Sequence, residues 1–239
     1  MNIQILGISQ IGEISEGDDL TGVILDAADG SNDLRPQLLD GDVLVVTQKV
    51  VSKAEGQVVA VDADDADSHR PVAEAEAVRI LRRRGDLIIT ETKHGFVCAN
   101  SGVDRSNVVD GTVTLLPEDS DRSARRIRDQ VKARLGIDVG VIVSDTFGRP
   151  WRRGVTDVAI GCAGIAAVVD LRGTPDALGR ELSVTEVAVV DEIAATADLV
   201  MGKAKGMPAA IVRGVEPSWL RASSIRDEIV RSPGEDLFR

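Results

Sequence analysis

The sequence predicts a mixed α+β fold. Short apolar runs rich in valine and isoleucine recur along the 239 residues, and each is too short to form a stable helix. Amphipathic helical patterns follow only some of these runs, which argues against a regular doubly wound parallel sheet. We therefore expect mixed, largely antiparallel sheets with flanking helices. Residues 1–239 would form one domain, with two interwoven subdomains as the alternative.

Nine apolar runs are expected to be strands, because most of them are bounded by Gly, Asp, Asn or Pro. An acidic, alanine-rich stretch at 62–69 is expected to be a solvated loop. The predicted strands are 3–6, 43–47, 58–61, 87–90, 113–116, 139–143, 155–160, 165–171 and 209–212.

Three segments have the periodicity of amphipathic helices. One is 74–84, which carries apolar residues on one side. A second, 122–135, follows Ser120 and Asp121 as candidate caps and ends at a glycine. The third, 183–201, opens with the spacing of a capping box and also ends before a glycine.

Composition limits the classes of partner. The net charge of −11 disfavours nucleic acid as a partner, and aromatic residues for base stacking are scarce. No apolar run approaches the ~20 residues that cross a bilayer. Cys98 and Cys162 lie in apolar surroundings as structural thiols, and the chain start lacks the features of a signal peptide, so we expect a cytoplasmic protein.

Two polar segments suggest a metal and nucleotide site. Asp104 lies in the turn NSGVDRSN, and Asp145 follows an apolar run at the start of SDTFGRPWRRG. With the Thr146 hydroxyl and the Asn107 amide, their oxygens suit magnesium or manganese rather than zinc. The alternative is that each aspartate only caps a turn. The second segment also carries a cluster suited to phosphate or a substrate carboxylate, formed by Arg149, Arg152 and Arg153.

A third segment, TQKVVSKAEG at 47–56, leaves a predicted strand and presents Gln48, Lys49 and Lys53. Lysine is a usable point charge for phosphate, although a solvated turn with ordinary surface lysines explains the pattern equally well. The two common glycine-rich nucleotide loops are absent. His94 is a candidate base near Asp104, but packing is the favoured interpretation of a lone histidine.

Four segments in the same order resemble the coenzyme F420-0:L-glutamate ligase family, also called coenzyme F420 gamma-glutamyl ligase. They are the three segments above and the stretch 170–202, and the resemblance covers nearly the whole chain. It implies a gamma-glutamyl ligase-like fold. In some members a nitroreductase-like flavin domain follows, and this chain ends at Arg239 without one, so the stand-alone form is expected.

The resemblance implies GTP-dependent addition of L-glutamate to the coenzyme F420-0 precursor, with magnesium or manganese and potassium, in a homodimer. Asp104, Asp145 and Thr146 would be metal ligands, and Asp104, Asp145 and Arg149 are the candidate catalytic residues. Implied nucleotide contacts are Ile11, Gly12, Glu13, Ile14, Gln48, Lys49, Lys53, Asn107, Met201, Gly202, Lys203, Ala204, Lys205, Gly206 and Met207.

The expected chemistry is activation of a carboxylate by transfer of the γ-phosphoryl group, followed by attack of the glutamate amine on the acyl phosphate. Two rival interpretations stay open. A metal-dependent phosphohydrolase needs the same aspartates and arginines but no amine acceptor. A non-catalytic nucleotide-sensing module would bind GTP without turnover.

Overall fold

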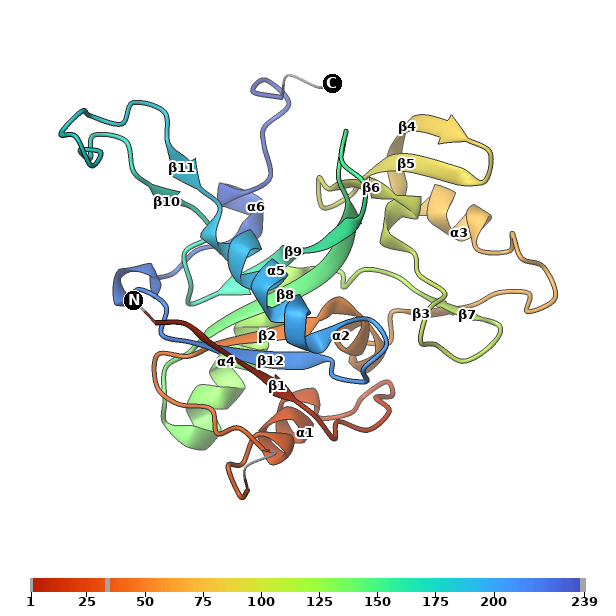
Figure 1. Ribbon diagram of the computed structural model, residues 1–239. Coiled ribbons are helices and arrows are strands. Elements are labelled where there is room, and N and C mark those ends of the chain that lie inside the picture. The colour runs from red at the N-terminus through yellow and green to blue at the C-terminus, as the bar shows by residue number, and fades with distance from the viewer. Residues whose placement is uncertain (1, 33–34, 237–239) are drawn as a thin grey trace.

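A computed structural model describes residues 2–32 and 35–236, and a five-stranded sheet forms its centre (Figure 1). The strand order is β1-β12-β2-β8-β9, and β2 and β8 are the one parallel pair of this described sheet. The mixed α+β prediction is confirmed. The strands are β1 (Gln4–Ile8), β2 (Val43–Thr47), β8 (Gly140–Gly148), β9 (Val155–Ala163) and β12 (Ala209–Arg213).

Helices cover both faces of this sheet. In β2, Leu44 and Val46 belong to a core cluster with α1 (Leu20–Ala27) and α4 (Ser120–Leu135), whereas Val43 and Val45 pack with α5 (Val189–Met201). Successive side chains of a strand point to opposite faces, so a strand buried on both sides is apolar throughout. This explains the unbroken run in β2.

Smaller sheets extend from this centre (Figure 1). One pairs β3 with β7, a second contains β4, β5 and β6, and a third is the two-stranded arm β10–β11. The strands are β3 (Val58–Ala60), β4 (Ala77–Arg84), β5 (Leu87–Thr92), β6 (Val97–Ala99), β7 (Thr112–Thr114), β10 (Val169–Asp170) and β11 (Glu186–Val187). The remaining helices are α2 (Gln48–Ala54), α3 (Arg70–Ala75), η1 (Asn100–Gly102), η2 (Pro217–Trp219) and α6 (Ile225–Glu228).

Eight of the nine predicted strands are present, and 62–69 contains neither helix nor strand. β2 has the predicted bounds, and one or both ends are shifted in β1, β3, β5, β7, β8, β9 and β12. The prediction for 165–171 is largely wrong, because only Val169–Asp170 pairs as a strand. Just before it, the Ala166 and Ala167 amides donate to Trp219 O and Ser223 Oγ at 2.7 and 3.0 Å. These bonds to the C-terminal segment replace a sheet ladder.

The predicted helix over 74–84 is also wrong. A short helix, α3, ends at Ala75, and 77–84 forms strand β4. Pairing with β5 prevails over the helical pattern, and an ion pair of 3.1 Å between Arg79 and Glu91 crosses the two strands. Val78 is 68% exposed, so the supposed apolar side is not buried as one face.

The other two helices are present with different starts. α4 ends at Gly136 as predicted, but its N-cap is Asp119, which accepts a hydrogen bond from the Arg122 amide, and not Ser120 or Asp121. α5 begins at Val189, because Glu186–Val187 pairs in β11, so the capping box is wrong. Amphipathic periodicity in the sequence did not predict α1 or α2. Among the described residues, no helix is both long and apolar enough to cross a membrane.

Candidate active site

A cleft of about 330 Å³ opens where the parallel pairing of β2 with β8 ends, at Thr47 and Ser144. This is the position at which open α/β sheets commonly bind ligands. It collects residues from α2, the loop after η1, the turn after α5 and the turn after β1. The predicted site residues that line it are Ile11, Gly12, Glu13, Gln48, Lys49, Lys53, Asp104, Asn107, Asp145, Thr146, Gly202, Lys203, Gly206 and Met207.

Helix α2 presents two lysines to the cleft. Lys49 and Lys53 are four residues apart, so they lie on one side of the helix. The buried Gln48 fixes the start of α2, because its amide donates to Leu115 O at 2.7 Å and to Ser52 Oγ at 2.6 Å. Gln48 also lines the cleft, but this amide is committed to the protein.

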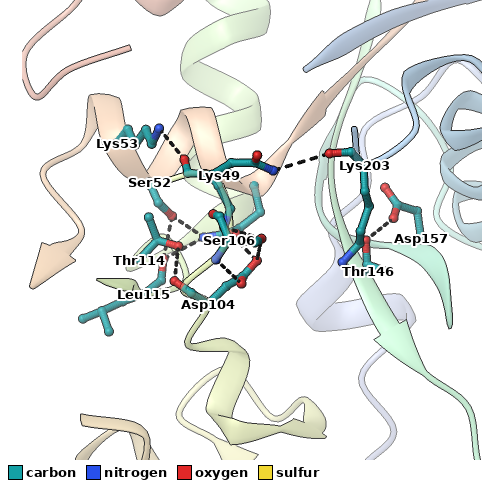
Figure 2. Close-up of polar contacts among 12 residues, drawn as sticks. Lys49, Ser52, Lys53, Asp104, Ser106, Thr114, Leu115, Thr146, Asp157 and Lys203 are labelled. Carbon is teal, nitrogen blue, oxygen red and sulfur yellow. Dashed lines mark hydrogen bonds and ion pairs between the residues drawn. The ribbon is translucent and has the colours of Figure 1, made fainter. Parts of the chain in front are cut away.

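Asp104 lies opposite α2 (Figure 2). Its backbone forms a two-bond bridge with Thr114, with N···O distances of 3.1 and 2.9 Å. Its carboxylate accepts from Lys49 Nζ at 2.7 Å and from the Ser106 amide and hydroxyl at 2.8 and 2.7 Å. Burial opposes ionisation, but these hydrogen bonds prevail and hold the pKa of Asp104 below its ordinary value. The carboxylate is therefore ionised at neutral pH.

Lys53 connects the turn after β1 to the loop after η1 that carries Asp104. Its ammonium is paired with Glu13 and donates to the Asn107 carbonyl at 2.8 Å. The Asn107 amide in turn reaches Lys203 O at 3.4 Å, which ties the loop to the turn after α5 (Figure 2). Three segments distant in sequence thus meet around Lys53.

Asp145 lies in β8 on the other side of the cleft. Burial, followed by the nearby carboxylates of Asp157 and Asp104, raises its pKa to about 7, although the Thr146 amide and the charge of Lys203 act in the opposite direction. The charge of Asp104 affects the pKa of Asp145 because both residues line the same cleft. The two aspartates, 41 positions apart in the sequence, therefore converge.

Asp157 also lines the cleft, and the sequence interpretation missed it. It lies on β9 directly opposite Thr146 and is 3% exposed. Its carboxylate accepts from Ser144 Oγ at 2.8 Å. It also accepts from Thr146 Oγ1 at 2.7 Å (Figure 2). The available signal was an acidic residue inside the apolar run of β9, where an unpaired charge is costly to bury.

Other predicted residues lie outside the cleft. Ile14 and Met201 are buried in the two core clusters. Lys205 donates to Leu199 O and Val200 O at 3.2 and 3.3 Å. Ala204 is in the turn after α5 but does not line the cleft.

The arginine cluster lies in the exposed turn between β8 and β9, away from the cleft lining. Within this turn the Arg149 guanidinium donates to Arg153 O at 3.1 Å. The structure therefore does not bring Arg149, Arg152 or Arg153 to the aspartates.

Neither His94 nor the cysteines line the cleft. His94 Nε2 contacts Pro117 O and Glu118 O at 3.0 and 3.2 Å, and the ring stacks on Phe96. Burial lowers the pKa of His94, and it raises the pKa of Cys98 and of Cys162 to about 12. The packing interpretation of all three fits these surroundings.

The donor set fits a hard divalent cation. The buried Asp145 carboxylate ionises with difficulty beside two other carboxylates, and a cation would offset that repulsion. In residues 2–32 and 35–236 no three His, Cys, Asp or Glu side chains form a preformed metal-binding group. Magnesium commonly keeps several waters and phosphate oxygens beside one or two protein carboxylates, which agrees with this arrangement.

A family model described as F420-0:Gamma-glutamyl ligase matches residues 8–214, which include every cleft residue named above. The coenzyme F420:L-glutamate ligase of Methanopyrus kandleri is 44% identical over 244 residues, covering 95% of this chain and 94% of the relative. That of Methanothermobacter thermautotrophicus is 40% identical over the full length of both chains. That of Methanocaldococcus jannaschii is 42% identical over 84% of this chain and 85% of the relative.

These matches and the charged cleft define the chain as an enzyme of the ligase class. More narrowly, the chain belongs to the F420-0:gamma-glutamyl ligase family.

Proposed function

We propose that this chain is a GTP-dependent ligase that joins L-glutamate to coenzyme F420-0 through a gamma-glutamyl linkage. The observation that carries the proposal is one cleft in which the α2 lysines face Asp104 and Asp145, in a chain 40–44% identical to relatives named coenzyme F420:L-glutamate ligase.

The proposed reaction has two steps. A carboxylate oxygen of F420-0 attacks the γ-phosphorus of GTP, so that the bond to the β,γ-bridging oxygen breaks and GDP leaves. The product is an acyl phosphate. The glutamate amine then attacks the acyl carbon, inorganic phosphate leaves, and the nitrogen loses a proton as the amide forms. Activation is required because an unactivated carboxylate has a poor leaving group.

In this scheme the protein positions charges rather than forming bonds of its own. Lys49 and Lys53 are suited to the phosphates, because both ammonium groups lie at the cleft. Magnesium or manganese would be held by Asp104, Asp145 and Thr146, and when bound it would neutralise charge on the phosphates. Holding amine and carboxylate together is worth on the order of 7–11 kcal/mol of the barrier.

The Asn107 amide and the glycine-bearing turn after α5 complete the proposed nucleotide pocket. Gly202 and Gly206 have φ values of 53° and 64°, a region that favours glycine, and both residues line the cleft. Potassium, a homodimer and a cytoplasmic location belong to the same proposal, on the strength of family resemblance and, for location, of the two unpaired cysteines.

The test is product analysis after incubation with GTP, magnesium, L-glutamate and F420-0. We expect GDP, phosphate and a deazaflavin product heavier by one glutamyl residue, with GDP release dependent on glutamate and F420-0. Phosphate release without the heavier product would favour the phosphohydrolase. Stoichiometric GTP binding without turnover would favour the sensing module.

A further inference from the structure

Asp157 is a buried acidic side chain without a basic partner in the described part of the chain. Its hydrogen-bond partners there are the hydroxyls of Ser144 and Thr146, and no lysine or arginine is paired with it. Two hydroxyl bonds are weak compensation for a carboxylate that is 3% exposed. Packing alone would be served better by an apolar residue, so a role at the cleft explains its presence.

The strand register sets the geometry. Thr146 and Asp157 are directly paired across β8 and β9, and Ser144 lies two residues away on the same face of β8. A register shift between Val143 and Ser144 adjusts the pairing of the two strands just before these residues. Asp157 therefore reaches both hydroxyls from one place on β9.

Each hydroxyl has one proton and two lone pairs. Thr146 donates its proton to Asp157 Oδ1, so only acceptor capacity remains on the Thr146 oxygen. Phosphate oxygens are acceptors too, and they cannot bond to a hydroxyl that has no proton left to give. The remaining lone pairs on Thr146 suit a cation.

We propose that Asp157 is a positioning residue that fixes the Thr146 hydroxyl with its lone pairs toward a divalent cation at the cleft. This rests on the proposed function, in which Thr146 is a ligand of that cation. Asp157 does not touch the cation. It acts by holding the proton of Thr146 on the side away from the ligand site, as partners of ligating groups do in other metal sites.

The test is a double-mutant cycle of Asp157→Asn and Thr146→Val, read as Mn²⁺ affinity. Free Mn²⁺ is followed by electron paramagnetic resonance in the presence of GDP, with thermal unfolding as the check of folding. We expect D157N to weaken Mn²⁺ binding by about 10–100-fold, since asparagine offers one acceptor oxygen for the two hydroxyls and lacks the negative charge that holds the Thr146 proton. In the T146V background, D157N should weaken it no further.

Asp191→Asn is the matched control. Asp191 is a partly buried acid that contacts β9, through a 2.9 Å hydrogen bond from the Ala159 amide, but it does not line the cleft. We expect D191N to bind Mn²⁺ as the wild type does. If D157N fails to fold, Asp157→Ser takes its place in the cycle, because it removes the carboxylate without adding an amide.

Several results would overturn the proposal. One is that D157N binds Mn²⁺ as tightly as the wild type, and another is that the losses of affinity in D157N and T146V add in the double variant. The others are that D191N loses as much Mn²⁺ affinity as D157N, and that the wild type binds no Mn²⁺. The assay needs neither glutamate nor F420-0, so its outcome is separate from that of the ligase assay. If the double-mutant cycle is non-additive but the ligase assay gives no product, the positioning role of Asp157 stands and the proposed reaction is rejected.

Discussion

Lys49 Nζ lies 2.7 Å from Asp104 Oδ2, so the carboxylate proposed to hold a cation is paired with a lysine of the same cleft (Figure 2). The two residues are 55 positions apart and come from α2 and the loop after η1. A cation and the ammonium compete for the same carboxylate oxygens. Release of Lys49 toward a phosphate would free Asp104 for the cation.

Lys49→Ala should therefore change metal and nucleotide binding in opposite directions. Without nucleotide, Mn²⁺ affinity should rise a few-fold, because a partly exposed ion pair is worth at most about 1 kcal/mol. GTP affinity should fall by about tenfold or more with the loss of a charge-assisted contact. Calorimetric titration measures both. Lys93→Ala, a surface lysine paired with Glu76, is the control, and a fall in both affinities would contradict the competition.

Asp145→Asn should remove glutamate-dependent GDP release while the protein stays folded. Burial and the neighbouring carboxylates raise the pKa of Asp145 to about 7, so the folded state binds its proton more tightly than the unfolded chain does. Its contribution to stability is therefore lost as pH rises from about 4 to about 7. In metal-free protein, D145N should keep a higher melting temperature than the wild type at pH 8 but not at pH 4. Undiminished GDP release at ordinary magnesium would refute the role.

Much of the fold was readable from local patterns. The β-branched run of β2 and the glycine that ends α4 each carry a strong local signal, and both predictions are confirmed. The segment 77–84 was misread, because its choice between helix and strand depends on pairing with β5, which a local pattern does not contain.

The site was predicted only in part, because local sequence patterns mark some of its residues and not others. Asp104 and Asp145 stand in polar, glycine-bearing segments that mark them directly. Asp157 has no such marker, because its place opposite Thr146 follows from the register of β8 and β9. Arg149 had a strong local signal but lies in the turn beyond the cleft, so composition alone overstated its closeness to the aspartates.

Asp121→Ala should cost about 3 kcal/mol or more of unfolding free energy. Asp121 is buried in α4 and accepts from the amides of Cys162 and Ile225 at 2.8 and 2.9 Å and from Arg226 at 3.2 Å. Removing the carboxylate leaves these donors unpaired, at about 1–3 kcal/mol for each buried one. Urea denaturation measures the loss. Asp119→Ala, which removes the cap of the same helix, should cost only about 1 kcal/mol, and equal losses would contradict the linking role of Asp121.

Glu228→Gln should lower stability at neutral pH and have a fading effect in acid. Both Glu228 oxygens accept from Arg221, at 2.7 and 2.9 Å, and this lowers the pKa of Glu228 to about 2. A carboxylate with a lowered pKa contributes its full stabilisation above its unfolded pKa of about 4.5, and that contribution is lost as pH falls toward 2. Because the pair is partly exposed, we expect about 1 kcal/mol at pH 7.

Urea denaturation at pH 7, 4 and 3 tests this, with the difference between variant and wild type isolating Glu228 from the other carboxylates. Glu118→Gln is the control, because its pair with Arg122 is largely exposed and should contribute little at any pH. A deficit in E228Q that stays constant down to pH 3 would mean that the loss comes from the shape of the side chain and not from its charge. The ion pair would then not be what holds the segment around Arg221 against Val168.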